Sequence, residues 1–227
     1  MREAVEKKVL SENDRVAAAL RQRFRERGIL CVNLISSPGF GKTTLLERTL
    51  ATLPRDAAVA VLTGGIQTDN DAQRLARFGF PVRQITTGGT CHLDARMIER
   101  ALEALPLAES SLLFVENVGN LVCPASYDLG EAAKIVLLSV TEGEDKPLKY
   151  PGIFYRASLM VLTKTDLLPH VEFDAARARE NARCIHSEIE IIELSCRTGD
   201  GLDQWIAWLG AKGRQFRAEV APAHRGA

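Results

Sequence analysis

A glycine-rich loop near the start of the chain carries the clearest chemistry in the sequence. Residues 34–46 read L-I-S-S-P-G-F-G-K-T-T-L-L and stand between an apolar run and a helical pattern. Glycine tolerates unusual backbone angles and lets N–H groups approach an anion closely. A helix that begins after such a loop also points the positive end of its dipole at the anion. This order predicts a strand, a phosphate-binding loop and a helix.

The residues of this loop match the phosphate-binding pattern G-x-x-x-x-G-K-S/T with two exceptions. Lys42 supplies a mobile charge for the β- and γ-phosphates, and the Thr43 hydroxyl can bind Mg²⁺. Ser36 occupies the first glycine position, and the bulky Phe40 stands inside the loop. The alternative is an ordinary strand–turn–helix connection with an incidental lysine. We expect the nucleotide phosphates to be bound by six consecutive residues: Gly39, Phe40, Gly41, Lys42, Thr43 and Thr44.

A second element, late in the chain, is suited to reading the base. Residues 163–166 read T-K-T-D at the end of an apolar run, in a pattern similar to the N/T-K-x-D element of P-loop GTPases. The Asp166 carboxylate can accept hydrogen bonds from guanine N1–H and its exocyclic amine, and the Lys164 stem can lie over the purine. Ser195 and Cys196 end the following predicted strand, where GTPases close over the base. The alternative for Lys164 and Asp166 is a solvated pair of loop charges.

A third candidate lies where another apolar run ends, at Glu116. Its carboxylate can reach the shell of Mg²⁺, and the backbone N–H of Gly119 can sense a γ-phosphate. The segment is similar to the D-x-x-G switch of GTPases, with Glu in the Asp position. The alternative is an ordinary turn that contains glycine. We expect Lys42, Thr43, Glu116 and Gly119 to form the catalytic group, with Thr43 and Glu116 as the Mg²⁺ ligands.

Cysteine and histidine side chains offer a possible site for a softer metal. Cys91 and His92 are adjacent and are predicted to open a helix, and Cys123 follows the third candidate segment. Thiolate and imidazole are ligands that suit Zn²⁺ and Ni²⁺. Because neighbours on one helix do not chelate easily alone, a third ligand or a second subunit is expected. The alternative is that each cysteine packs as a small hydrophobe, as we expect of Cys31 and Cys184.

Apolar runs alternate with helical patterns along the chain. A charged amphipathic helix is predicted over residues 3–27, and its apolar face carries Val5, Val9, Val16, Leu20 and Phe24. Strands are predicted at 29–36, 58–63, 82–86, 111–116, 134–140, 158–163 and 189–194. Further helices are predicted at 42–52, 69–78, 92–105, 174–187 and 202–216. The alternation indicates an α/β fold of the P-loop NTPase class, with a mostly parallel sheet, helices on both faces, and ligands beyond the carboxyl ends of the strands.

Composition narrows the class of protein further. The chain has 227 residues, enough for one α/β domain, and zero formal net charge, which gives no footprint for nucleic acid. No apolar run is long enough to span a bilayer, and residues 1–30 are too charged for a signal peptide. Five scattered cysteines fit a reducing cytoplasm. We expect an N-terminal helix at 1–28, a P-loop GTPase domain at 29–217 and a flexible tail at 218–227, with neither nucleic acid nor membrane as a partner.

Together these motifs closely resemble the hydrogenase nickel-incorporation GTPases, the HypB family. The matching stretches are V-N-L-I-S-S-P-G at 32–39, T-C-H-L-D-A at 90–95, E-N-V-G-N-L-V-C-P at 116–124, S-V-T-E-G-E-D-K-P-L-K-Y-P at 139–151 and T-G-D-G-L at 198–202. The resemblance covers nearly the whole chain, from the N-terminal helix to about residue 209. Ser36 in place of glycine is ordinary for this family.

The resemblance implies a cytoplasmic metallochaperone that binds GTP with Mg²⁺ and hydrolyses it slowly. It also implies a GTP-promoted homodimer that delivers Ni²⁺ to the large subunit of nickel–iron hydrogenase with a partner nickel chaperone. The family's site for Ni²⁺ or Zn²⁺ lies at the dimer interface and uses a Cys-His pair and a later Cys, which correspond to Cys91, His92 and Cys123. Since Cys123 closely follows the γ-phosphate sensor, nucleotide state is expected to reshape the metal site.

Three positions depart from the family pattern. Phe40 replaces a small residue, Thr163 replaces asparagine, and Gly65 stands where the family has an acid that assists Mg²⁺. Asp69 or Asp71 is a candidate substitute for this carboxylate. Two other functions stay open: a urease-type nickel GTPase chaperone, and a nucleotide-binding regulatory or scaffold protein that has lost turnover, which Phe40 and Gly65 suggest.

Overall fold

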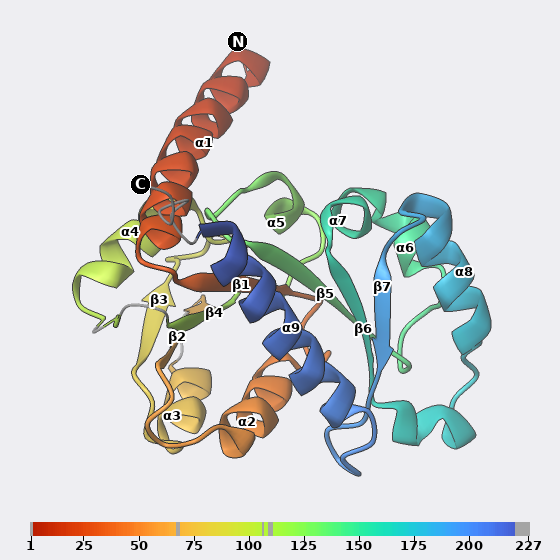
Figure 1. Cartoon of the computed structure of the whole chain (residues 1–227). Helices are drawn as coiled ribbons and strands as arrows, with labels where there is room; N and C mark the ends of the chain where they lie inside the picture. Colours follow the sequence, from red (N-terminus) through yellow and green to blue (C-terminus); the bar gives the residue numbers. More distant parts are fainter. Residues whose placement is uncertain (1, 67–68, 106, 109–110, 221–227) are drawn as a thin grey trace, which may run out of the picture.

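Seven strands in the described part of the chain form one sheet. The computed structural model describes residues 2–66, 69–105, 107–108 and 111–220, with the backbone alone for residues 2–6. The strands are β1 (Leu30–Ile35), β2 (Val59–Gly65), β3 (Val82–Thr86), β4 (Leu112–Glu116), β5 (Ala133–Ser139), β6 (Leu159–Thr163) and β7 (Glu190–Glu193). Their order is β3-β2-β4-β1-β5-β6-β7 (Figure 1). All neighbouring strands are parallel, which confirms the predicted fold class.

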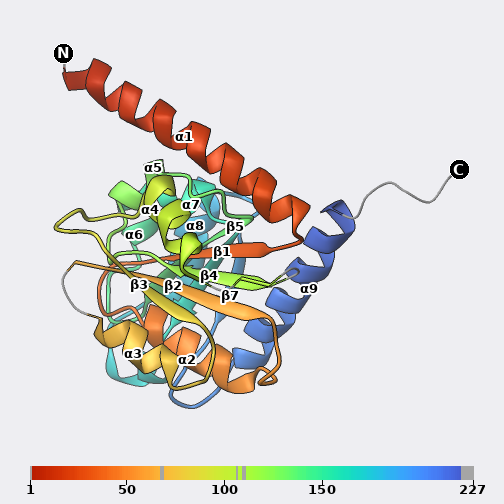
Figure 2. The same ribbon diagram turned by 90° about the vertical axis from the view of Figure 1, so that its left-hand side faces the viewer.

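Helices connect the strands and cover both faces of the sheet. They are α1 (Arg2–Glu26), α2 (Lys42–Thr52), α3 (Asn70–Ala76), α4 (Ala95–Glu103), α5 (Cys123–Ser126), α6 (Lys146–Lys149), α7 (Pro151–Arg156), the 3₁₀ helix η1 (Thr165–His170), α8 (Ala175–Ile185) and α9 (Leu202–Val220). Helices α1 and α4 lie over one face, and α2, α3 and α9 lie over the other (Figure 2). None of the helices described is both long and apolar enough to cross a membrane.

Alternate residues of the central strands fill two apolar layers. Val61 of β2 and Phe114 of β4 belong to the layer that includes residues of α2 and α9. Leu113 and Val115, on the opposite side of β4, belong to the layer that includes residues of α1 and α4. Since side chains alternate across a strand, a strand buried on both faces reads as a continuous apolar run. The apolar runs therefore located the strands to within about two residues.

Helix α1 packs on the sheet through its C-terminal half. Val16, Leu20 and Phe24 are buried, as the amphipathic pattern predicts, but Val9 is 50% exposed. The first turns of α1 extend past the sheet (Figure 1), so no element of the described part of the chain covers that face. Val9 thus lies on the apolar face of the helix without being buried, and the side chain of Val5 lies outside the described residues.

The other differences from the sequence prediction are short or terminal. The pattern does not predict α5, α6, α7 or η1, which have four to six residues each, too few for a helical period to show. Helix α4 begins at Ala95 rather than at residue 92, because Asp94 caps it by accepting from Met97 N at 2.8 Å. Helix α9 continues to Val220, so residues 218–220 of the expected tail are helical, and 221–227 lie outside the described residues.

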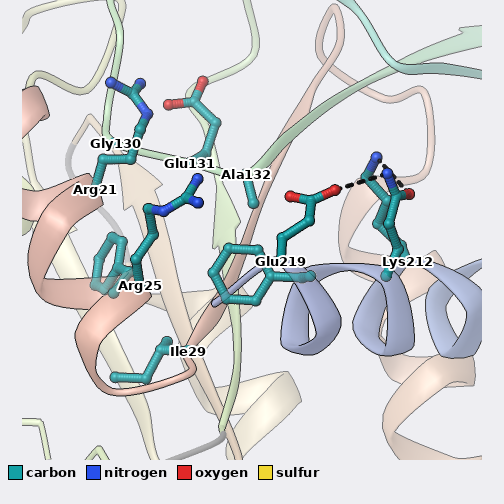
Figure 3. Close-up of a pocket in the computed structure, with 11 residues that line it drawn as sticks. Arg21, Arg25, Ile29, Gly130, Glu131, Ala132, Lys212 and Glu219 are labelled. Atoms are coloured by element: carbon teal, nitrogen blue, oxygen red, sulfur yellow. Dashed lines mark hydrogen bonds between the residues drawn. The ribbon is translucent and has the colours of Figure 1, made fainter. Parts of the chain in front are cut away.

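A cavity of about 170 Å³ lies between α1, α9 and the start of β5 (Figure 3). Ile29 and Ala132, which line it, directly precede β1 and β5. Arg25 of α1 and Glu219 of α9 flank the opening. Ligands of parallel α/β sheets bind beyond the carboxyl ends of the strands. This cavity is at the amino ends, on the opposite edge from the loops that carry the candidate residues.

We expect the Asn13→Ala substitution to destabilise the fold by roughly 1–3 kcal/mol, because it leaves buried polar groups without partners. The Asn13 side chain is buried, donates to Asp128 O at 2.9 Å and accepts from Ala95 N at 2.9 Å. Urea unfolding measures the change, with the substitution of the exposed neighbour Asp14→Ala as the control. Equal stability of the two variants would contradict this account of how α1 is anchored.

Candidate nucleotide and metal site

The phosphate loop joins β1 to α2 and depends on two glycines. Gly39 has φ 77° and Gly41 has φ 94°, a region that side chains with Cβ rarely adopt. Gly41 is the N-cap residue of α2, and the helix begins at Lys42, as predicted. Gly39, Gly41, Lys42, Thr43 and Thr44 all line one cavity of about 580 Å³ beyond the carboxyl end of β1. The N-terminus of α2 therefore faces a space in which an anion can bind.

Ser36, which occupies the first glycine position of the motif, holds Lys42 inside this loop. Lys42 Nζ lies 3.0 Å from Ser36 Oγ, and both side chains are buried. Burial lowers the pKa of Lys42, while the nearby Glu116 carboxylate acts in the opposite direction. The serine thus gives the ammonium group a hydrogen-bond acceptor when no phosphate is present.

Glu116 meets Thr43 at the floor of the cavity. Thr43 Oγ1 donates to Glu116 Oε1 at 2.6 Å, and Oε2 is buried with no hydrogen-bond partner in the described part of the chain. Burial raises the pKa of Glu116 to about 7, although Lys42 and the Thr43 hydrogen bond lower it. A buried carboxylate oxygen without a partner, beside a hydroxyl, is the donor set expected for Mg²⁺. The residues present therefore fit a Mg²⁺–nucleotide complex.

Gly119 brings the segment after β4 into contact with the phosphate loop. A Cβ at this position would lie 2.9 Å from both Cγ and N of Pro38, closer than such atoms approach. Residues 116–119 line the same cavity as the loop. Glycine is thus required here by close packing, and the segment cannot move without changing its contact with the loop.

A pocket of about 260 Å³ adjoins this cavity, since both are lined by Gly41 and Thr44. Its other walls include Phe40, Lys164, Asp166 and Cys196 from the predicted base-binding elements. The structure therefore brings the phosphate loop and the T-K-T-D element together, although more than 100 residues separate them.

Phe40 does not block the phosphate loop. Its side chain is only 2% exposed and belongs to the apolar core, where it also borders the smaller pocket. The Thr163 hydroxyl donates to Phe40 O at 2.8 Å and so ties the end of β6 to the loop. Two of the three departures from the family pattern are thus part of one contact between the phosphate loop and the base pocket.

Ser195 lies behind Asp166. Its hydroxyl, fully buried, donates to Asp166 Oδ1 at 2.6 Å and accepts from the backbone N–H groups of Arg197 and Thr198. It therefore orients the carboxylate and holds the turn that closes over the pocket. Cys196 borders the pocket itself, and burial raises the pKa of its thiol to about 11, so it is a neutral wall residue.

Two arginines of the site, Arg48 and Arg74, were not indicated by sequence motifs. Arg48 of α2 donates to Cys196 O at 2.6 Å and to Arg197 O at 3.2 Å, and it fixes the closing turn to the phosphate-loop helix. Asp71 and Arg74 of α3 line the larger cavity beside Gly65. The sequence left Asp69 and Asp71 as alternatives, and Asp71 is the one at the cavity. An arginine within an ordinary helical pattern gives no local signal of such a contact.

The candidate metal ligands converge within one chain. Cys91 Sγ lies 3.0 Å from Cys123 Sγ, His92 Nδ1 lies 4.0 Å from Cys91 Sγ, and the ligand atoms of all three residues lie within 4.8 Å of one another. Both cysteines are free thiols. Cys91 and His92 precede α4 rather than opening it, so the expected difficulty of chelation from one helix does not arise.

The surroundings of this cluster favour a neutral imidazole at His92. Burial lowers the pKa of His92, although Asp94 acts in the opposite direction, and the His92 ring stacks on Tyr127 at a centroid distance of 3.8 Å.

The two cysteines that were expected to pack in the core differ from each other. Cys31 is buried as expected, but Cys184 is exposed, because the buried face of α8 is formed by Ala178, Asn181 and Ala182.

A parallel sheet whose first strand leads through a glycine loop to a helix, with a lysine and a threonine facing the cavity, defines a protein of the P-loop NTPase class. Residues 30–193 match the family described as CobW/HypB/UreG, nucleotide-binding domain. The chain belongs to this family and, by its relatives, to the HypB hydrogenase maturation factors within it.

Three relatives give the extent of the similarity. The hydrogenase maturation factor HypB of Escherichia coli is 55% identical over 205 residues, covering 90% of this chain and 71% of the relative. The hydrogenase/urease maturation factor HypB of Helicobacter hepaticus is 48% identical over 192 residues, covering 83% and 78%. The crystal structure of HypB from Helicobacter pylori in complex with nickel has a TM-score of 0.86 and 40% identity, covering 95% of this chain and 100% of that chain.

We expect the Gly119→Ala substitution to weaken nucleotide binding and to cost roughly 1–3 kcal/mol of stability, because the added methyl group would overlap Pro38. Thermal unfolding and nucleotide titration measure the two effects. Gly210→Ala in α9 is the matched control, since the nearest atom to its Cβ would be Nη1 of Arg214 at 3.4 Å. Nucleotide affinity equal in the two variants would show that the contact with the phosphate loop is dispensable.

Proposed function

We propose that this protein binds GTP, hydrolyses it slowly, and helps to insert nickel into nickel–iron hydrogenase as a metallochaperone. The observation that carries the proposal is the 3.0 Å approach of Cys91 Sγ to Cys123 Sγ, with Cys123 only four residues beyond Gly119. A metal-binding thiol pair therefore lies directly beside the segment that contacts the phosphate loop. The nickel complex of the Helicobacter pylori relative supports nickel as the cargo.

In this proposal the phosphate cavity performs phosphoryl transfer to water. The backbone from Gly39 to Thr44 and the Lys42 ammonium group bind the phosphates, and Gly119 N–H senses the γ-phosphate. Thr43 and Glu116 would hold Mg²⁺, which supplies charge neutralisation when bound. Asp71 is a candidate for the carboxylate that position 65 lacks, since Gly65 and Asp71 line the same cavity. With one acidic group fewer beside the phosphates, we expect hydrolysis to be slow.

The base pocket supports GTP over ATP in this proposal. Asp166 can accept two hydrogen bonds from the guanine edge, and Ser195 keeps its carboxylate oriented. The Lys164 backbone adopts φ 61°, which is unusual for a residue with a side chain, and it marks the turn at which the lysine stem reaches the pocket. Phe40, Cys196 and Leu167 add the apolar walls.

In the proposed metal site, Cys91, Cys123 and His92 hold Ni²⁺ or Zn²⁺ as cargo. Three ligands from one chain leave room for further ligands in the four-coordinate arrangement that such metals commonly adopt. A second subunit can supply them, so we propose a homodimer promoted by GTP. Its partners would be a second nickel chaperone and the hydrogenase large subunit, in the reducing cytoplasm that suits five free cysteines.

The two alternative functions are distinguished by observations on other members and on this chain. The Helicobacter hepaticus relative is named for both hydrogenase and urease maturation, so nickel delivery for urease stays the second candidate. A scaffold without turnover is less well supported, because Phe40 is buried away from the phosphates. Single-turnover GTP hydrolysis, compared with Lys42→Ala, separates an enzyme from a scaffold.

For the base, we expect the Asp166→Asn substitution to weaken GTP binding roughly 10–100-fold, because charge-assisted hydrogen bonds to guanine contribute about 1.5–3 kcal/mol each. The amide should bind xanthosine triphosphate better than the wild type does, since it can donate to the additional carbonyl. Competition between GTP, ATP and xanthosine triphosphate measures the preference, with the exposed Asp203→Asn as the control. A wild type that binds ATP as well as GTP would contradict the assignment of residues 163–166.

For the cargo, we expect Cys91→Ala and Cys123→Ala each to lose at least tenfold in Ni²⁺ and Zn²⁺ affinity, since substitution of residues that merely support metal ligands costs roughly 10–100-fold. His92→Ala should have the smaller effect of an auxiliary ligand. Calorimetric titration with and without a GTP analogue measures affinity and stoichiometry, and light scattering gives the oligomeric state. Cys184→Ala, an exposed thiol outside the cluster, is the control. Equal binding by all these variants would remove the site.

A further inference from the structure

The residue after Glu116 connects the phosphate cavity to the metal-binding loop. Asn117 is buried and lines the cavity. Its Oδ1 accepts from Leu93 N at 3.2 Å and from Val118 N at 2.9 Å. Leu93 is two residues beyond Cys91, so the amide of Asn117 binds the backbone of the loop that carries the first thiol.

Leu93 makes a second contact with the nucleotide side of the site. Its side chain is fully buried, and a Cβ at Gly64 would lie 2.9 Å from its Cγ and Cδ1. Gly64 lies near the end of β2 and, with Gly65, lines the phosphate cavity. Leu93 is therefore packed against one wall of the cavity while its backbone is bound to another.

The orientation of the Asn117 amide is fixed from behind. Its Nδ2 donates to Asn33 Oδ1 at 3.3 Å, and Asn33 Nδ2 donates to Glu131 Oε1 at 3.2 Å. All three side chains are buried. Because the nitrogen is bound on this side, the amide oxygen must face Leu93, and the amide cannot rotate without breaking hydrogen bonds in the core.

The two thiols are thus joined to the segment 116–119 by different routes. Cys123 follows it along the chain, and Asn120 supports that connection by accepting from Val122 N at 2.8 Å. Cys91 is joined to it across space, through the hydrogen bond of Leu93 N to Asn117 Oδ1. A shift confined to residues 118–122 would change the position of Cys123 but not this hydrogen bond.

We propose that Asn117 is a positioning residue that makes Cys91 follow the nucleotide state, so that the Cys91–Cys123 pair opens or closes as a unit when the phosphate cavity is filled. Leu93 is the contact through which it acts. This inference rests on the proposed function, because it specifies how that function's two sites are coupled. Reciprocity of linked binding requires metal to change nucleotide affinity by the same factor.

The test uses metal-free protein, so that it reads the position of the thiols directly. Wild type, Asn117→Ala and Asn181→Ala are alkylated with iodoacetamide in GDP and in a non-hydrolysable GTP analogue, and the rate at each cysteine is followed by mass spectrometry. We expect both Cys91 and Cys123 of the wild type to react at rates that differ between nucleotides. In Asn117→Ala this difference is lost at Cys91 and kept at Cys123. Asn181→Ala removes a buried amide of α8 that donates to Glu144 O and lies outside this network, so it keeps both differences.

A second arm separates this inference from the proposed function. Zn²⁺ affinity is measured in both nucleotide states, and a coupling factor of about fivefold or more is expected for the wild type, falling towards one in Asn117→Ala. A wild type that binds no Zn²⁺ contradicts the proposed function, whereas the alkylation result still decides the role of Asn117. If Asn117→Ala does not fold, Leu93→Ala takes its place with the same expected loss at Cys91. An unchanged nucleotide difference at Cys91 in these variants, or none in the wild type, overturns the inference.

Discussion

Parallel pairing of β1 with β4 on one side and with β5 on the other is the constraint on which the site depends. Parallel strands end at the same edge, so the loops after β1, β2, β4 and β6 must all emerge together. The register places Leu34 opposite Glu116, and from there Thr43 at the start of α2 reaches the carboxylate at 2.6 Å. Strand pairing thus brings residues that are far apart in the sequence together at this edge.

The sequence predicted the features that depend on a local pattern of neighbouring residues. Apolar runs located the seven strands, most clearly the central ones that are buried on both faces, and the glycine loop located the start of α2. The sequence did not show that Phe40 turns into the core or that Ser195 supports Asp166, because both facts depend on contacts with distant elements. The Cys91–Cys123 pair is similar, since residue types suggested ligands but only the folded chain brings the two sulfur atoms to 3.0 Å.

Buried polar groups at this edge are arranged in two different ways. The amides of Asn33 and Asn117 have partners on both sides, an arrangement that specifies a single geometry for the surrounding loops. Glu116 instead has one oxygen without a partner and a raised pKa. Satisfied groups hold the framework in place, while the unpartnered oxygen of Glu116 is free to accept a bond from a ligand in the cavity.

The hydrogen bond between Lys42 and Ser36 affects how a nucleotide binds to the site and how it leaves. An incoming phosphate meets an ammonium group that has three N–H donors, one of which is already bound to the Ser36 hydroxyl. Where the phosphate takes the place of this hydroxyl, binding is an exchange of acceptors, and the net gain is smaller by the worth of one hydrogen bond, about 1 kcal/mol, or several-fold in affinity. Release of the nucleotide is eased to the same extent, because the Lys42 ammonium group can bind the Ser36 hydroxyl again. Lys42 therefore has a hydrogen-bond acceptor both before a nucleotide binds and after it leaves.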